Sequence, residues 1–212
     1  MEKPFVDLVT LEPPPISQTG VSALYTREFY TLAQDRLTEG GWLTQWLPAY
    51  QLPEARVLSL VRAFVDVFPD AVLLVGQGRE LVLVGRRGGP PVLDVDAVAQ
   101  RLGSRTEVAD DLDAIGIPDV RALVATFATD GPALRAATLS SPPLTDDWPI
   151  AEASQVSHIA DNLMPRVLFQ PERFGAFAPA LTNDPDAIES AADRAVFWQT
   201  EDFLRYHTLP SP

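Results

Sequence analysis

The sequence has no cysteine in its 212 residues. Disulfide bonds, thiolate nucleophiles and cysteine-ligated zinc are therefore excluded together, and the cytoplasm is the default compartment. No run of eighteen apolar residues occurs, so we expect no membrane-spanning helix. The chain does not open on a basic stretch followed by an apolar one, so we expect no secretory signal. Together these absences predict a cytoplasmic protein with no membrane partner.

Basic residues are scarce. Sixteen lysines and arginines stand against 29 aspartates and glutamates, which gives a net charge of −13. The excess is uneven, because residues 1–90 hold eight basic and ten acidic residues whereas residues 91–212 hold eight and 19. An acidic surface repels phosphate backbones, so we expect no binding of nucleic acid. Most of these carboxylates are expected to form a solvated acidic face.

Hydrophobic residues make up 46% of the chain, which is enough for a sizeable core. Along residues 5–85, strand-favouring segments alternate with segments whose apolar residues recur at helical spacing. We expect strands at 5–11 and 41–47, helices from Thr26 to Gly40-Gly41 and from Pro53 to Pro69, and a hairpin of 71–76 with 80–85. This order predicts a three-layer α/β fold with parallel strands and an antiparallel hairpin.

The first of these helices has the clearest signals. Thr26 is the expected N-cap, and Gly40-Gly41 the expected end, since glycine adopts the left-handed conformation at least cost. The buried stripe is expected to consist of Phe29, Leu32, Ala33 and Leu37.

Residues 91–212 differ in character from the first part. We expect short helices with acidic faces at 94–102, 107–115 and 118–128, a loop at 140–149, an irregular segment at 165–184, and a helix at about 186–206 capped by Asp184. The sequence therefore predicts two units, an α/β domain at 1–90 and an acidic, mainly helical extension at 91–212.

Several familiar motifs are absent or incomplete. Gly76-Gln77-Gly78 lacks the third glycine of a dinucleotide-binding loop, and a strand follows it where a helix must begin. We expect His158 and His207, in the poorly patterned tail, to be surface or packing residues. No pattern predicts a metal site.

Two polar residues lie at or near the carboxyl ends of the expected parallel strands. Glu12 comes directly after the first strand, on a loop stiffened by Pro13-Pro14-Pro15, and Gln45 lies near the end of the second. Ligands of open α/β sheets bind beyond the carboxyl ends of the strands, where a carboxylate can accept a proton from an amine. We therefore expect Glu12 and Gln45 to open onto a common cleft. The alternatives are a glutamate that only closes the strand–loop junction and a half-buried strand glutamine.

Asp146-Asp147 is a carboxylate pair within the expected loop at 140–149. Such a pair can recognise a cation, which makes both residues candidates for substrate binding. The alternative is that they are turn and capping residues, the usual role of adjacent aspartates before Trp-Pro.

A family resemblance is carried by Glu12-Pro13-Pro14-Pro15, by the stretch Gly-Val-Ser-Ala-Leu-Tyr-Thr-Arg-Glu-Phe-Tyr at 20–30, by Leu37 and Gly40-Gly41, and by Gln45-Trp46-Leu47. Phe68-Pro69 and Thr145-Asp146-Asp147-Trp148-Pro149 add to it. These residues resemble the spermidine synthase-like, or polyamine aminopropyltransferase-like, family. The resemblance is dense over 5–85 and reappears at 144–149.

This resemblance implies a Rossmann-like domain that binds S-adenosylmethionine or its decarboxylated form, and the transfer of an aminopropyl group to a small amine. It places Glu12 at the position of the family's catalytic base and Gln45 near its amine pocket. The family's second acidic position falls on Pro15, which carries no charge, and this departure argues against putrescine as the substrate.

The resemblance also implies that the first strands, the glycine-rich loop and the ribose-binding acidic residue precede the strand at 5–11, where only four residues stand. We therefore expect the C-terminal half of a class I methyltransferase-like domain that binds no cofactor alone, with a partner chain supplying the missing half.

Three hypotheses follow. The chain is an aminopropyltransferase-like protein that is active only with its missing half, or a non-catalytic remnant or interaction module, or an amino-methyltransferase. The third rests on the likeness of Glu-Pro-Pro to the Asp/Asn-Pro-Pro-aromatic motif, but Pro15-Ile16 lacks the stacking aromatic ring.

Overall fold

The computed structural model describes residues 5–75, 80–147, 165–170, 173–177, 182 and 184–196. Its strands are β1 (Val6–Leu11), β2 (Leu37–Leu47), β3 (Val72–Val75), β4 (Leu81–Arg86) and β5 (Phe127–Asp130). Its α-helices are α1 (Arg27–Gln34), α2 (Glu54–Val67), α3 (Val95–Ser104), α4 (Thr106–Ala114), α5 (Val120–Ala125), α6 (Gly131–Ala137), α7 (Phe174–Phe177) and α8 (Pro185–Val196). Short 3-10 helices lie at η1 (Val21–Tyr25), η2 (Ala49–Gln51) and η3 (Arg166–Leu168).

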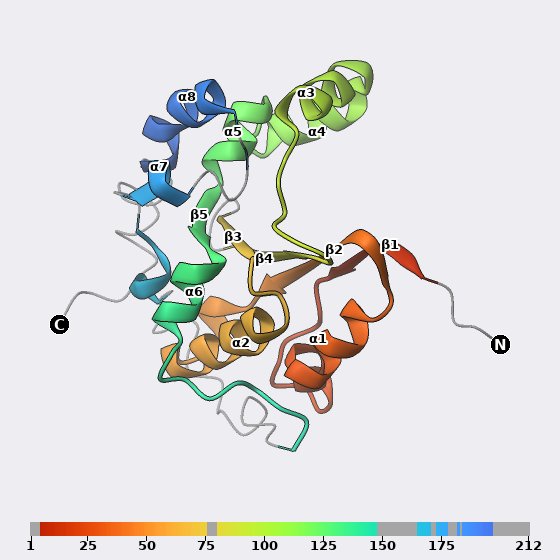
Figure 1. Cartoon of the computed structure of the whole chain (residues 1–212), viewed down its shortest axis with the longest axis vertical. Coiled ribbons are helices and arrows are strands. Elements are labelled where there is room, and N and C mark those ends of the chain that lie inside the picture. The colour runs from red at the N-terminus through yellow and green to blue at the C-terminus, as the bar shows by residue number, and fades with distance from the viewer. Residues whose placement is uncertain are drawn as a thin grey trace.

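The five strands form one mixed sheet in the order β1-β2-β4-β3-β5 (Figure 1). Strands β1 and β2 are parallel, with Thr10 opposite Thr44 and Leu11 opposite Gln45. The other three pairs, β2–β4, β4–β3 and β3–β5, are antiparallel. The expected α/β fold with a parallel pair and an antiparallel hairpin is therefore confirmed.

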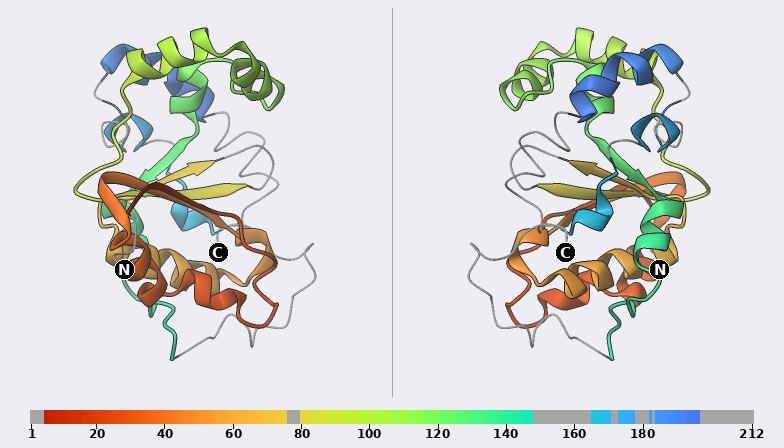
Figure 2. Two further views of the ribbon diagram at one scale, coloured as in Figure 1. Left: turned by 90° about the vertical axis from the view of Figure 1, so that its right-hand side faces the viewer. Right: turned by 90° about the vertical axis from the view of Figure 1, so that its left-hand side faces the viewer.

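Helices lie on both sides of the sheet (Figure 2). The first face, which carries Leu43 and Leu47, packs against α1 and α2 in the larger core cluster. The second face, which carries Val72 and Val84, packs in a separate cluster with residues of α5, α7 and α8. The sheet therefore separates two hydrophobic cores. Among the described residues, none of the helices combines the length and the apolar character that crossing a bilayer requires.

Helix α1 begins where the sequence predicts but ends earlier. The Thr26 hydroxyl accepts a hydrogen bond from the Phe29 amide at 3.2 Å, which confirms the N-cap. The helix stops at Gln34, and Leu37 is already the first residue of β2. The expected stripe is therefore wrong in part, because Leu32 is 56% exposed and Leu37 is buried from a strand.

The Gly40-Gly41 pair lies inside β2 and does not end a helix. Between Val6 and Leu8 the register of β1 moves from Leu37 to Trp42, so that β2 bulges through the glycines. Gly40 has φ of 78°, a backbone conformation that a side chain disfavours. The glycines therefore allow β2 to bulge instead of ending a helix. Strand β2 is eleven residues long, where six or seven were expected.

Strand β5 replaces the end of an expected helix. The prediction of a helix over 118–128 holds for α5 but fails from Phe127 onward, where the four-residue strand β5 pairs along the outer edge of β3. Pairing along an existing edge outweighs the local propensity of so short a segment. The sheet thus takes a strand from beyond residue 90. The expected irregular stretch at 165–184 also contains η3 and α7.

The last helix begins as predicted. The Asp184 carboxylate accepts a hydrogen bond from the Ala187 amide at 3.0 Å, so Asp184 is the N-cap of α8. The part of the expected helix beyond Val196 lies outside the described residues.

Candidate functional site

Glu12 lies immediately beyond β1, at the carboxyl end of the parallel pair. Its side chain is exposed, whereas the following Pro13 is buried and Ile16 is only 2% exposed. The loop is therefore anchored in the core while the carboxylate stays outside. Among the described residues, Glu12 takes part in no ion pair or hydrogen bond. Its carboxylate is available to a ligand.

Gln45 is fully buried on the first face of the sheet. Its Nε2 atom donates a hydrogen bond to the Trp46 carbonyl at 3.0 Å, but its Oε1 atom has no hydrogen-bond partner. The nearby Tyr25 hydroxyl is also buried without a partner. Burial raises the pKa of Tyr25 well above its usual value, the Gln45 amide opposes this, and the charge of Glu12 adds to it. Gln45 thus lies beside Tyr25, although the two side chains do not meet hydrogen-bond geometry, and the charge of Glu12 acts on the Tyr25 hydroxyl.

A cavity of about 450 Å³ lies over the second face of the sheet. It is lined by Thr10, Leu11, Glu12, Thr44, Trp46, Leu74, Glu80, Val82 and Val84. Two polar contacts organise its wall: the Thr44 hydroxyl donates to the Thr10 hydroxyl at 2.8 Å, and the Trp46 indole N–H donates to the Glu80 carboxylate. Glu12 contributes to this cavity.

The expected common cleft for Glu12 and Gln45 is not found. Successive side chains of a strand point to opposite faces, so Gln45 lies on the face opposite to its neighbours Thr44 and Trp46. Both neighbours line the cavity, whereas Gln45 is enclosed in the core beneath it. The two candidate residues lie at the ends of adjacent strands but do not share an open surface.

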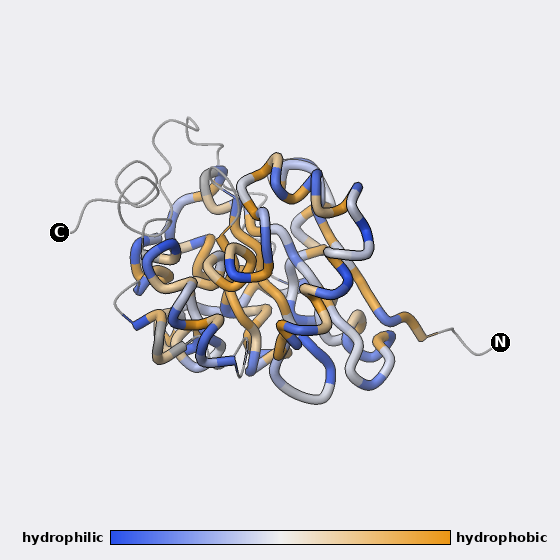
Figure 3. Tube along the Cα trace, turned by 90° about the horizontal axis from the view of Figure 1, so that it is seen from above, coloured by the Kyte–Doolittle hydropathy of each residue, from blue (hydrophilic) through white to orange (hydrophobic). Residues whose placement is uncertain are grey.

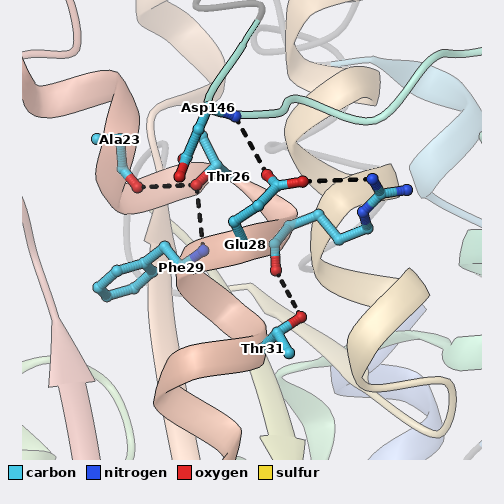
Figure 4. A network of polar contacts seen from close by, with 7 residues as sticks. Ala23, Thr26, Glu28, Phe29, Thr31 and Asp146 are labelled. Atoms are coloured by element: carbon cyan, nitrogen blue, oxygen red, sulfur yellow. Dashed lines mark hydrogen bonds and ion pairs between the residues drawn. The ribbon is translucent and has the colours of Figure 1, made fainter.

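The loop that carries Asp146 and Asp147 is fastened to α1 (Figure 4). The Asp146 backbone amide donates to the Glu28 carboxylate at 3.1 Å, and the Arg27 amide donates to the Leu144 carbonyl at 3.0 Å. Burial opposes ionisation of Glu28, but the amides of Glu28 and Asp146 together with the Arg27 guanidinium outweigh it and lower its pKa. Asp146 therefore docks the loop through its backbone. Both aspartate side chains are exposed, and neither lines the cavity with Glu12.

No metal or phosphate site emerges from the described ranges. Within them, no three potential ligand side chains come together in a way that could hold a metal ion. The strand-to-helix junction of β5 and α6 does not provide a phosphate site. The Asp130 carboxylate already accepts a hydrogen bond from the Ala133 amide, and Gly131 packs against the backbone, since a Cβ there would lie 2.1 Å from the Pro69 carbonyl oxygen. Gly76-Gln77-Gly78, His158 and His207 lie outside the described residues.

Three residues of the site were not predicted as such. Tyr25 lies within the stretch at 20–30 that carries the family resemblance, which is the signal that could have found it, and the structure buries it completely. Trp46 stands out in the sequence only as the neighbour of Gln45. Glu80 has a signal in the period of its strand, because it precedes Val82 and Val84 by an even number of residues and therefore shares their face.

Comparison with known proteins adds no relative: no protein-family model, no curated protein and no solved structure gives a significant match to this chain.

Proposed function

We propose that this chain carries the amine-binding half of a spermidine synthase-like aminopropyltransferase, and that it acts on an amine together with a cofactor-binding half that the described residues do not show. The sheet supports this proposal through its parallel pair β1–β2 followed by an antiparallel hairpin, as the resemblance implies for this half. The chemistry rests on Glu12, a free carboxylate at the carboxyl end of β1.

The observation that carries the proposal is that β1 is an edge strand with exposed apolar side chains. It is the last strand on its side of the described sheet, and its trace in Figure 3 is a mostly hydrophobic strip that leads toward the N-terminus. Leu8 is 56% exposed and the preceding Phe5 61% exposed. Parallel strands are normally buried on both faces, and an exposed edge strand is a template for a further strand. Contact with the other half of the domain would bury the exposed side chains of β1 and would pair its free edge with a further strand.

In the proposed reaction the amine nitrogen attacks the propyl carbon bonded to the sulfonium of decarboxylated S-adenosylmethionine. The new C–N bond forms as the C–S bond breaks, and methylthioadenosine leaves. The nitrogen then carries one proton too many, which Glu12 accepts. The described residues show no glycine-rich turn for an adenosine group, so this half positions the amine and the other half holds the co-substrate.

A reconstitution experiment tests the proposal. The full chain is mixed with a separately expressed N-terminal half of a spermidine synthase-like domain, and complex formation is followed by size-exclusion chromatography. Methylthioadenosine release is then measured with decarboxylated S-adenosylmethionine and a panel of amines. We expect release from the complex and from neither half alone. A complex that binds the co-substrate but releases no methylthioadenosine with any amine would overturn the proposal.

A second candidate function is that of a non-catalytic interaction module. The burial of Gln45 away from the cavity favours it, because the family's amine pocket is then incomplete on the Glu12 side. This candidate predicts the same complex through β1 but no turnover, so one experiment separates the two. Methyl transfer is the weakest of the three hypotheses, because Pro15 stands at the position of the stacking aromatic residue and the next residue, Ile16, is buried in the core.

A further inference from the structure

Helix α4 carries an apolar stripe that its neighbours leave uncovered. Val108, Leu112 and Ile115, the C-cap, follow one another at intervals of four and three residues, which places them on one side of the helix and defines the α4 stripe. Val108 is 44% exposed and Ile115 45% exposed, and no residue of α4 is buried or belongs to either core cluster. Helix α4 packs mainly against α3, and Figures 1 and 2 show this pair at the periphery of the molecule, beyond α5.

Acidic side chains border the α4 stripe. The helix holds no basic residue and four exposed carboxylates, those of Glu107, Asp110, Asp111 and Asp113. At about 3.6 residues per turn, Glu107 and Asp111 share the flank of the helix that lies next to Val108 and Ile115. None of the four carboxylates forms an ion pair with a described residue.

These charges oppose the helix that carries them. Like charges three or four residues apart destabilise a helix, and Glu107 has this spacing to both Asp110 and Asp111. Asp111 and Asp113 also lie in the last turn, where the helix dipole disfavours anions and no basic residue compensates. Neither core packing nor local electrostatics therefore stabilises α4. A cationic partner that covered the α4 stripe would supply both kinds of stabilisation.

Other occupants of the stripe do not match this charge. Of the two long segments outside the described residues, 148–164 holds no lysine or arginine and two acidic residues, and 197–212 holds one arginine and two acidic residues. A second copy of the chain carries the same net charge of −13, which opposes its approach. Anionic lipid and nucleic acid are repelled by the same carboxylates. A basic amphipathic helix matches both the stripe and its flank.

We propose that α4 is a docking surface for a basic amphipathic helix of a partner protein. The α4 stripe receives the apolar residues of that helix, and Glu107 and Asp111 pair with its lysine or arginine side chains. The inference does not rest on the proposed function, because no residue of α4 lines the cavity that contains Glu12.

A synthetic peptide serves as the probe for this surface. The probe is two repeats of Leu-Lys-Lys-Leu-Leu-Lys-Leu with a fluorescent label, and two control peptides carry Glu in place of Lys or Ser in place of Leu. Fluorescence anisotropy measures binding to the full chain at physiological ionic strength. We expect the probe to bind about tenfold or more tightly than either control peptide, and to slow amide hydrogen exchange in α4.

Charge variants test the flank. Glu107→Gln combined with Asp111→Asn removes two charges beside the stripe, and Glu39→Gln combined with Asp70→Asn removes two exposed charges outside α4. We expect the first pair to weaken probe binding about fivefold or more and the second to change it less than about twofold. In the free chain the first pair should slow amide exchange in α4, because repulsion is relieved. Weaker binding by a more stable helix then reports a lost contact and not a lost fold.

Apolar variants test the stripe. Val108→Ser combined with Ile115→Ser should weaken probe binding about tenfold, since the peptide no longer buries apolar surface there. Leu32→Ser is the control, because Leu32 is 56% exposed on α1, and it should leave binding unchanged. Circular dichroism checks that each variant is folded.

Several results would overturn the inference. These are equal binding of the three peptides, equal losses in the α4 variants and their controls, or a loss in the charge variants alone, which would indicate unspecific attraction. Slow exchange of α4 in the free chain that Val108→Ser with Ile115→Ser abolishes would assign the stripe to a segment of this same chain. A dimer that dissociates in that variant, seen by sedimentation, would assign it to a second copy.

Discussion

The side chains of Tyr25 and Gln45 lie close together in the core beneath the carboxyl ends of β1 and β2, and the Tyr25 hydroxyl and Gln45 Oε1 are both buried without hydrogen-bond partners. Tyr30, whose ring packs edge-on against Phe64, carries a third unpartnered oxygen in the same core. Buried polar groups without partners cost free energy, so these three oxygens lower the stability of this core.

Tyr25→Phe should therefore stabilise the folded chain. Removing an unpartnered buried hydroxyl is expected to raise the free energy of unfolding by about 1 kcal/mol, measured by urea denaturation at neutral pH. The pKa of Tyr25 is raised in the fold, so its contribution to stability is intact below the unfolded value of about 10 and is lost as the pH rises above it. The variant should lose less stability than the wild type above pH 10. A destabilised variant would contradict the absence of a partner.

Gly85→Ala tests the close approach of α2 to β4. A Cβ at Gly85 would lie 2.5 Å from Cγ of Phe68, and Phe68 is itself buried. We expect a loss of about 1–3 kcal/mol in the free energy of unfolding, because the ring cannot withdraw from a packed core. Gly103→Ala is the control, since a Cβ there meets nothing within 4 Å and the residue lies in α3. It should be neutral or stabilising by up to about 1 kcal/mol. Equal effects at both sites would refute the packing argument.

Glu28 should fasten the loop at 140–147 in a pH-dependent way. Its pKa is lowered in the fold, so its contribution is present above the unfolded value and is lost as the pH falls below about 4.5. Glu28→Gln should speed amide hydrogen exchange at Asp146 at neutral pH and remove the acid dependence of that exchange. The effect on global stability should stay below about 1 kcal/mol, since the Glu28 side chain is 40% exposed. Unchanged exchange at Asp146 would show that the Arg27–Leu144 backbone bond alone holds the loop.

The elements that could be predicted from sequence are those with local signals. The Thr26 and Asp184 caps, the apolar period of α2 and the hairpin of β3 and β4 each follow from a few adjacent residues. The early end of α1 and the four residues of β5 could not be predicted in this way. Both depend on strand pairing with residues far along the chain, Leu37 with Val6 and Thr129 with Leu73.

The candidate site was predictable in position but not in orientation. Glu12 and Gln45 do lie at the carboxyl ends of adjacent parallel strands, as the alternation of strands and helices indicated. Which face each side chain takes depends on the register, and a one-residue difference moves a side chain to the other side of the sheet. Glu80 was missed for the complementary reason, because only the pairing of β2 with β4 brings it to Trp46.

The rate of methylthioadenosine release by the reconstituted complex, compared between wild type and Glu12→Gln, tests the central claim most directly. Glutamine keeps the shape and hydrogen bonding of Glu12 but cannot accept the proton of the attacking amine. General-base catalysis contributes about a hundredfold or more to a rate, so the variant should turn over about a hundred times more slowly while forming the same complex. Wild-type turnover in the Glu12→Gln complex would contradict the assignment of Glu12 as the base.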